Sequence, residues 1–264
     1  MLCTQLEKKY KKSSYLNLFF GSYHYLKSDF IKSEGYLETS LELDESNLGS
    51  LNLQGLVKTK LGKDTEAISC FNDILKINNK DINALNNLGN LYRKRGKHDD
   101  SLLFINKALE IEPENINLMI NKTSSLISSG MFQEAKELSY SIFQKTKNNS
   151  ILLNNLGIIS GYFNNYDDAL DFFKQSNILE PQYIDPFINF IEVLIKTDRS
   201  NFAIDIIEEK ITFFEEPHKI YNLLSKLYDS TSQLQRGLKF YESILNNNIR
   251  FKYLVSNHIG NIYR

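Results

Sequence analysis

Residues 82–115 read INALNNLGNLYRKRGKHDDSLLFINKALEIEPEN and contain two short apolar segments with helical spacing. The first consists of Leu85, Leu88, Leu91 and Tyr92, and the second of Leu102, Ile105, Ala108 and Leu109. This spacing places side chains on one face of a helix. Gly96 lies between the segments, where glycine can end a helix with a positive φ, and Pro113 follows the second, where a helix cannot continue. The stretch therefore predicts a helix, a tight turn, a second helix and a stop.

Small residues indicate how closely these two helices pack. Gly89 in the first helix and Ser101 and Ala108 in the second lie where a larger side chain would hold antiparallel helices apart. We therefore expect the helix axes to approach to roughly 8–10 Å. A pair this short cannot bury both of its apolar faces alone, so the pattern predicts neighbouring pairs of the same kind.

The 34-residue length of this stretch recurs along the chain without insertion or deletion as far as Phe251. The predicted units are residues 14–47, 48–81, 82–115, 116–149, 150–183, 184–217 and 218–251. Position 8 of the units is occupied by Gly21, Gly55, Gly89, Thr123, Gly157, Ile191 and Ser225. Position 20 is small in every unit, with Ser33, Ala67, Ser101, Ala135, Ala169, Ala203 and Gly237. A phase shared over this length predicts a repeat array.

The repeat resembles the tetratricopeptide repeat family, whose pattern includes Leu-Gly at positions 7 and 8, Tyr at 11, Ala at 20 and 27, and Pro at 32. The units that match best carry Leu85, Leu88, Gly89, Tyr92, Ala108 and Pro113, and Leu153, Leu156, Gly157, Ala169, Phe173 and Pro181. The resemblance covers residues 14–251 and implies an all-α fold, a right-handed superhelix or α-solenoid of antiparallel helix pairs.

The sixth unit departs most from this pattern. Ile191 at position 8 and Lys210 at position 27 are large residues where the family has small ones. We therefore expect a wider helix pair in residues 184–217.

The two ends of the chain continue the repeat phase in part. Residues 1–13 match the end of a second helix, as if they were the remnant of a preceding repeat. Residues 252–264 match the first helix of an incomplete eighth unit, or a C-terminal cap. A bare terminal unit exposes the face meant for its neighbour. Two interpretations remain open: a piece of a longer protein, or a short protein that caps itself.

Charge and composition exclude some classes of partner. The formal net charge is −1, whereas a general nucleic-acid or anionic-membrane binder needs a basic excess or stripe. No apolar run approaches the roughly 20 residues of a membrane-spanning helix. Cys3 and Cys70 form no disulfide framework, which favours small buried thiols in a reducing, cytoplasmic setting. We expect neither nucleic acid nor membrane as a partner.

The sequence carries no recognisable catalytic or metal-binding constellation. No histidine lies at ligand spacing from a carboxylate or cysteine, and there is no phosphate-binding glycine loop or nucleophile motif. We therefore predict a protein that is not an enzyme, with no catalytic residue, no metal site and no cofactor.

The best candidate site is a row of asparagines. In this family the first helices line the concave face, and position 6 of four consecutive units here holds Asn87, Asn121, Asn155 and Asn189. Their neighbours on the same face include Asn86, Asn90, Lys94 and Asn154. An amide can pair with the N–H and C=O of an extended peptide without contacting its side chains. The row resembles the asparagine ladder of O-linked N-acetylglucosamine transferase, which implies capture of extended segments. The alternative interpretation is that these amides bond only within the array.

Three functions remain open on sequence alone. The first is a non-catalytic scaffold that binds an extended peptide or a partner protein in the concave groove. The second is the substrate-docking region of a larger enzyme, for example a glycosyltransferase, whose catalytic part lies elsewhere. The third is a structural solenoid that self-associates through uncapped ends.

Overall fold

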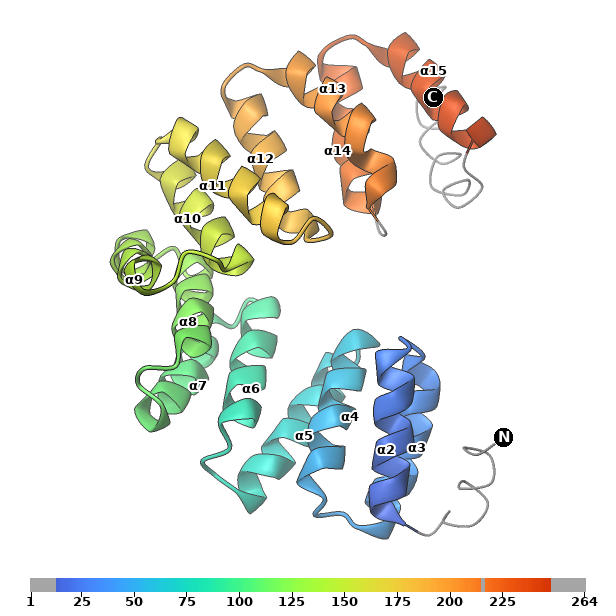
Figure 1. Cartoon of the computed structure of the whole chain (residues 1–264), viewed down its shortest axis with the longest axis vertical. Coiled ribbons are helices and arrows are strands. Elements are labelled where there is room, and N and C mark those ends of the chain that lie inside the picture. The colour runs from blue at the N-terminus through green and yellow to red at the C-terminus, as the bar shows by residue number, and fades with distance from the viewer. Residues whose placement is uncertain (1–12, 215–216, 248–264) are drawn as a thin grey trace. The chain divides into compact units, whose positions relative to one another are not determined.

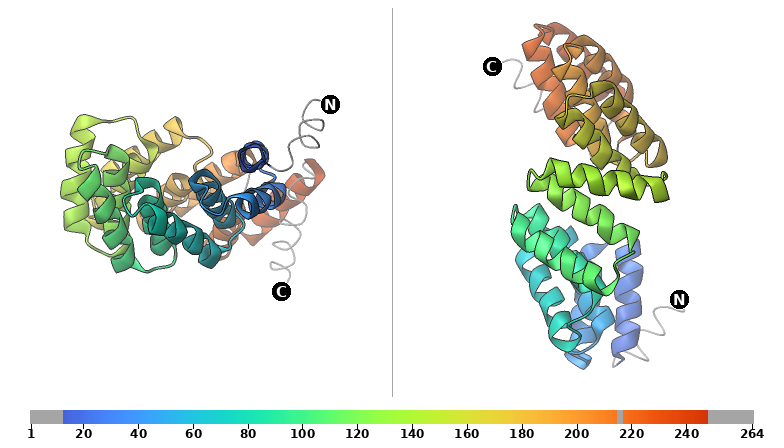
Figure 2. Two further views of the ribbon diagram at one scale, coloured as in Figure 1. Left: turned by 90° about the horizontal axis from the view of Figure 1, so that it is seen from below. Right: turned by 90° about the vertical axis from the view of Figure 1, so that its left-hand side faces the viewer.

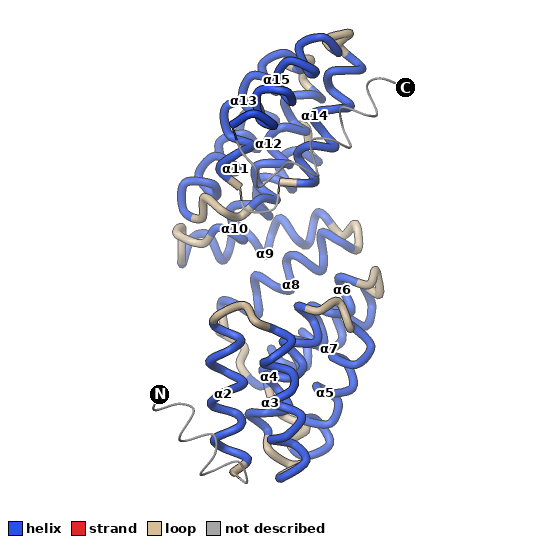
Figure 3. The backbone as a smooth tube through the Cα atoms, turned by 90° about the vertical axis from the view of Figure 1, so that its right-hand side faces the viewer, coloured by secondary structure: helices blue, strands red, loops and turns tan. Residues whose placement is uncertain are grey.

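The computed structural model describes residues 13–214 and 217–247, which form fourteen α-helices and one short 3-10 helix with no strand (Figure 1, Figure 3). The first helices of the pairs are α2 (Ser14–Leu26), α4 (Leu48–Lys60), α6 (Ile82–Lys94), α8 (Ile116–Ser128), α10 (Ser150–Tyr162), α12 (Ile184–Lys196) and α14 (His218–Ser230). The second helices are α3 (Phe30–Leu43), α5 (Asp64–Ile77), α7 (His98–Ile111), α9 (Phe132–Lys145), α11 (Tyr166–Leu179), α13 (Ser200–Lys210) and α15 (Leu234–Asn247). The 3-10 helix η1 (Ile211–Phe213) follows α13. The all-α class predicted from the sequence is confirmed over this part of the chain.

The chain divides into two compact units, residues 1–138 (unit 1) and 139–264 (unit 2), with the boundary inside α9. Within each unit, a second helix packs on the first helix of its own pair and on the first helix of the next pair (Figure 2). The predicted helix remnant in residues 1–13 lies outside the described residues except for Ser13, and the predicted incomplete repeat in residues 252–264 lies wholly outside them.

Helix starts recur with the sequence period. The first helices begin at Ser14, Leu48, Ile82, Ile116, Ser150, Ile184 and His218, which are 34 residues apart. Five of them have an N-cap side chain that accepts a hydrogen bond from a backbone N–H of the first turn. These capping residues are Ser13, Asn47, Asp81, Asn115 and Asn149. Such a cap satisfies one of the N–H groups that a helix start leaves unpaired, and it stabilises the helix by about 1 kcal/mol. The sixth and seventh first helices follow Tyr183 and Pro217, which provide no side-chain cap.

The turn inside every pair has the same backbone conformation. One residue per turn has a positive φ between 57° and 76°: Ser28, Gly62, Gly96, Gly130, Asn164, Asp198 and Ser232. Glycine, asparagine and aspartate tolerate this left-handed region better than other residues. The turn predicted at Gly96 is therefore one member of a series that continues where the glycine is absent.

Small residues at position 8 allow the second helix to pack closely. A methyl group added at Gly89 would lie 2.5 Å from Cγ1 of Ile105, and one added at Gly157 would lie 2.5 Å from Cε1 of Phe173. Both partners are large side chains at position 24, and both are buried. The large side chain of the second helix therefore occupies the space that a Cβ on the first helix would need.

This packing predicts opposite effects for two Gly→Ala substitutions. Alanine raises helix propensity by about 1 kcal/mol, but overpacking costs about 1–3 kcal/mol. Gly157→Ala should therefore lower the urea midpoint, because the new methyl collides with Phe173. Gly35→Ala should raise it, because Gly35 lies inside α3 with no atom within 4 Å of the added methyl. A gain in stability for Gly157→Ala would contradict the packing argument.

An ion-pair cluster joins the first two repeats of unit 1. Glu34 Oε1 lies 3.2 Å from Lys58 Nζ and 2.8 Å from Lys63 Nζ, and Lys58 also pairs with Glu66. Burial raises the pKa of Glu34, but hydrogen bonds and charges from Lys63 and Lys58 outweigh burial and hold this pKa below its ordinary value. The Lys58 side chain is only 10% exposed, so its charge depends on these carboxylates.

The lowered pKa of Glu34 makes the stability of unit 1 dependent on pH. A carboxylate whose pKa is lower in the folded state stabilises the fold above its unfolded pKa and loses that effect as pH falls. Glu34→Gln should therefore cost about 1–2 kcal/mol near pH 7 and progressively less below about pH 4. Urea titrations at several pH values measure the difference. Glu38→Gln on the same helix is the control, since Glu38 forms no ion pair among the described residues; an equal loss for both variants would contradict the prediction.

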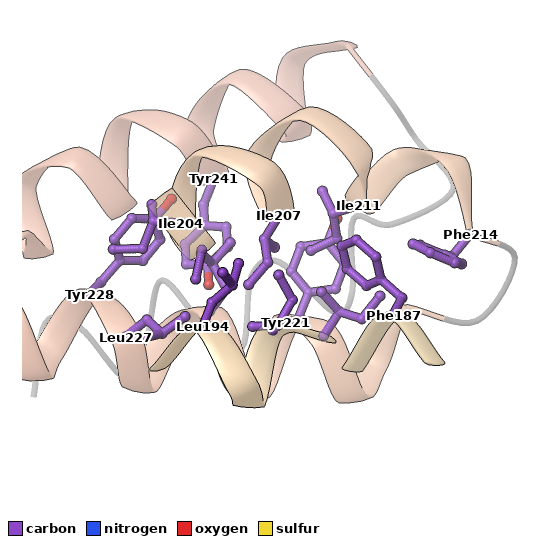
Figure 4. Close-up of a cluster of buried hydrophobic side chains, with 14 of the residues drawn as sticks. Phe187, Leu194, Ile204, Ile207, Ile211, Phe214, Tyr221, Leu227, Tyr228 and Tyr241 are labelled. Atoms are coloured by element: carbon purple, nitrogen blue, oxygen red, sulfur yellow. The ribbon is translucent and has the colours of Figure 1, made fainter. Parts of the chain in front are cut away.

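Unit 2 contains a buried cluster formed by α12 to α15 (Figure 4). Three tyrosines, Tyr221, Tyr228 and Tyr241, are fully buried in it. Tyr228 donates a hydrogen bond to Glu208, and Tyr241 and Ser225 share one of 2.8 Å between their hydroxyl oxygens. These bonds satisfy polar atoms that the apolar surroundings would otherwise penalise.

The sixth pair buries large side chains where most other pairs have a small residue on the first helix. Ile191 at position 8 and Ile207 at position 24 are both fully buried. No glycine is present at position 8 of this pair, and the greater width predicted for residues 184–217 stays a prediction.

Candidate functional site

The predicted asparagine row lies on the first helices and bonds between successive repeats. In unit 1, the Nδ2 of Asn87 donates to the Oδ1 of Asn52 at 3.3 Å, and the Nδ2 of Asn121 donates to the Oδ1 of Asn86 at 2.7 Å. In unit 2, the Nδ2 of Asn189 donates to the Oδ1 of Asn154 at 2.9 Å. The donor and acceptor are 35 residues apart in all three bonds. Position 6 of one repeat therefore binds position 5 of the repeat before it.

These inter-repeat bonds use only part of each amide. An asparagine side chain offers two N–H donors and an oxygen with two lone pairs. After one bond, Asn121 still has its oxygen and one N–H, and Asn86 still has both of its N–H donors. Both side chains are half-buried, so part of each amide remains accessible. The bond holds each amide in one orientation. The asparagine side chains would therefore lose less conformational entropy when a ligand binds.

The amides of unit 2 are less accessible than those of unit 1. Asn154 is 5% exposed and Asn155 is 3% exposed. Asn154 also donates from its Nδ2 to the hydroxyl of Tyr183 at 3.4 Å, so both ends of its amide are engaged. Asn189 remains half-buried. Sequence position alone did not distinguish the buried amides from the accessible ones.

Two further predicted residues lie at the other end of α6. Lys94 Nζ is 2.9 Å from Asp64 Oδ1, so a carboxylate of the preceding repeat holds the ammonium while 54% of the lysine side chain stays exposed. The Oδ1 of Asn90 is buried and has no hydrogen-bond partner among the described residues. A buried acceptor without a donor carries a desolvation cost of about 1–3 kcal/mol, which a donor from a ligand would relieve.

Two features of the first helices escaped the sequence prediction. Asn52 accepts a hydrogen bond from Asn87. Of the asparagines at position 5, the predicted site includes only Asn86 and Asn154. Tyr15, Phe19 and Tyr23 on α2 are 75%, 59% and 48% exposed. Their spacing of four residues places them on one face of α2, and this spacing is visible in the sequence.

The described residues also bear on metal binding, thiol reactivity and membrane-spanning helices. No group of three His, Cys, Asp or Glu side chains gathers as a metal ion would require in residues 13–214 and 217–247. Burial raises the pKa of the Cys70 thiol to about 11, so this thiol remains protonated at neutral pH. None of the helices described here has both the length and the apolar character needed to cross a lipid bilayer.

The inter-repeat amide bond should contribute measurably to stability. Asn121→Ala and Asn86→Ala should each lower the free energy of unfolding by about 0.5–1.5 kcal/mol, since each removes one side of the same hydrogen bond. The double variant should cost less than the sum of the two, as measured by urea titration in a double-mutant cycle. Strict additivity would show that the two amides do not interact.

Family models of the tetratricopeptide repeat match residues 48–81 and 82–115. No curated protein matches the chain.

Solved structures share the fold over most of the chain. A tetratricopeptide repeat protein from Parabacteroides merdae is 19% identical with a TM-score of 0.68, and the match covers 95% of this chain and 99% of that one. Yeast Tom70 is 16% identical with a TM-score of 0.67 over 99% of this chain and 57% of its own. YrrB, described as a TPR protein with an unusual peptide-binding site, is 17% identical with a TM-score of 0.52 over 71% of this chain and 96% of its own. At these identities the likeness establishes the fold alone.

Proposed function

Since the chain is a tetratricopeptide repeat protein, and such proteins generally mediate protein–protein interactions, we propose that it binds an extended segment of a partner protein along α4, α6 and α8. The proposed contacts are the amides of Asn86, Asn87, Asn90 and Asn121, with Lys94 at the end of the row. Repeats of this kind typically form non-catalytic scaffolds. The observation that carries the proposal is the pair of oriented, half-buried amides, Asn87 on Asn52 and Asn121 on Asn86.

The spacing of these amides suits an extended backbone. Helices packed side by side lie roughly 8–10 Å apart, and an extended chain rises about 3.3 Å per residue. Successive amides would therefore meet about every third residue of the peptide. Each amide has a donor and an acceptor left, which matches one N–H and one C=O of the peptide. Recognition of this kind depends on the peptide backbone and tolerates many side chains.

Buried amides are not part of the proposed contact set. Asn154 and Asn155 are 5% and 3% exposed, and a peptide would have to displace neighbouring side chains to touch them. Asn189 is half-buried, but the amide to which it donates, Asn154, is one of these buried side chains. The proposed site therefore lies in unit 1, where Asn86, Asn87 and Asn121 are half-buried.

The test uses a peptide selected on the full chain from a random library of 12-residue peptides. Asn87→Leu together with Asn121→Leu replaces two amides by apolar side chains of similar volume. Two lost hydrogen bonds at about 1 kcal/mol each should weaken binding roughly 30-fold. Asn72→Leu on the second helix α5 is the matched control and should leave the Kd unchanged. Fluorescence anisotropy measures the Kd, and circular dichroism checks that each variant is folded.

The peptide provides an independent test of backbone recognition. Methylation of the backbone nitrogen at every third residue gives three peptides, one for each starting residue. One of these three peptides should not bind, while alanine substitutions in the peptide should have small effects. Equal Kd values for the folded wild type and double variant, or affinity carried only by peptide side chains, would refute the proposal.

A further inference from the structure

A cavity of about 900 Å³ lies in unit 2 between the second helices α11 and α13. Phe187, Phe190 and Leu194 of α12 line it, and so does Phe214 after η1. Phe187 and Phe214 contact each other with ring centroids 5.0 Å apart (Figure 4). The cavity is lined by α11, α12 and α13, whereas the contacts proposed for the extended peptide lie on α4, α6 and α8, so the cavity involves none of those contacts.

The cavity lies at the sixth repeat, which departs most from the repeat pattern. Ile191 occupies position 8, where the family has a small residue, and its side chain is fully buried. Lys210 stands at position 27, where the family has a small residue, and its side chain is exposed and lines the cavity.

Large apolar side chains on the walls are exposed to solvent. Ile178 on α11 is 68% exposed, Phe202 on α13 is 54% exposed and Phe213 on η1 is 55% exposed. All three line the same cavity. Single exposed apolar residues are common on protein surfaces, but a contiguous group around a hollow is typical of an interaction site.

The chemistry of the walls favours a helical ligand over an extended one. A peptide bound against apolar side chains loses water from its backbone N–H and C=O groups, which must then find other partners. Most of the side chains that line the cavity are aromatic or aliphatic. A helix satisfies its backbone internally, so it can bury an apolar face here without that cost. The 11 residues of α13 span roughly 16 Å, or about three turns.

Charges at the rim indicate which helix would fit. Lys174 on α11 and Lys210 on α13 line the cavity, and neither forms an ion pair in the described part of the chain. Arg199 also lines it, with its Nη2 4.0 Å from a highly exposed oxygen of Asp167. The two acidic residues at the rim are Asp171, which accepts a hydrogen bond from Gln175, and Glu209. The rim therefore holds three basic and two acidic side chains, and its unpaired lysines complement acidic groups.

We propose that this cavity binds a short amphipathic helix of a partner protein, about three turns long, with apolar anchors at i, i+4 and i+7 and acidic residues beside them. The anchors cover Ile178, Phe202 and Phe213, and the acidic residues pair with Lys174 and Lys210. Helices that insert into apolar grooves bind in this general manner.

The test uses a display library of 12-residue peptides with apolar residues at i, i+4 and i+7 and flanks randomised among Glu, Lys, Gln and Ser. Selection on the full chain should enrich Glu at the flanks. Ile178→Glu and Phe202→Glu each change an exposed side chain, and each should weaken the enriched peptide at least tenfold. Phe19→Glu changes a residue of α2 that is 59% exposed, and it should leave binding unchanged. Lys174→Glu with Lys210→Glu should shift the selected flanks from Glu to Lys.

Several outcomes would overturn the proposal. These are no enrichment from the library, no preference at the flanks, equal binding to Phe202→Glu, or equal binding of a proline-interrupted peptide that cannot form a helix. Sedimentation velocity tests for a second copy of the chain in the cavity: a concentration-dependent mass abolished by Phe202→Glu would also overturn it. Asn87→Leu with Asn121→Leu should not affect the helical peptide, so this result and that for the asparagine row are independent.

Discussion

The contact between a small residue on the first helix and a large side chain on the second determines how each pair packs. In most pairs a glycine at position 8, which has no Cβ, allows the second helix to pack closely on the first. Gly89 faces Ile105 in this way, and Gly157 faces Phe173. The second helix then packs on the next first helix, so one tight contact sets the position of the following pair. This agrees with solenoids, in which each repeat depends mainly on its neighbours.

Polar residues reinforce the same period. The caps at Asp81 and Asn115, the positive-φ residue of each turn and the amide pairs of α4, α6 and α8 all recur at corresponding positions. An amide bond between successive first helices helps to align the repeats, and it leaves donors and acceptors free on the same surface. Structural and ligand-binding interpretations of the asparagine row are therefore compatible in unit 1. In unit 2 the burial of Asn154 and Asn155 favours the structural one.

The two proposed surfaces arise in opposite ways. The amide row follows from regularity, because identical residues one period apart come into register on adjacent first helices. The cavity lies at the irregular sixth repeat, where α11, α12 and α13 contribute exposed and half-buried apolar side chains. A repeat protein can thus carry a distinct apolar site without an inserted domain.

The sequence by itself determined the helix pairs, their starts, their turns and the all-α class, because these depend on local spacing, caps and breakers repeated every 34 residues. It also predicts a wider sixth pair, since Ile191 stands where the family has a small residue. Only the tertiary structure decided which amides bond to each other, which are buried, that the chain divides within α9, and that Phe202 and Ile178 flank one cavity. These properties depend on distances between side chains of different repeats, and a small displacement of a helix changes them without changing the period.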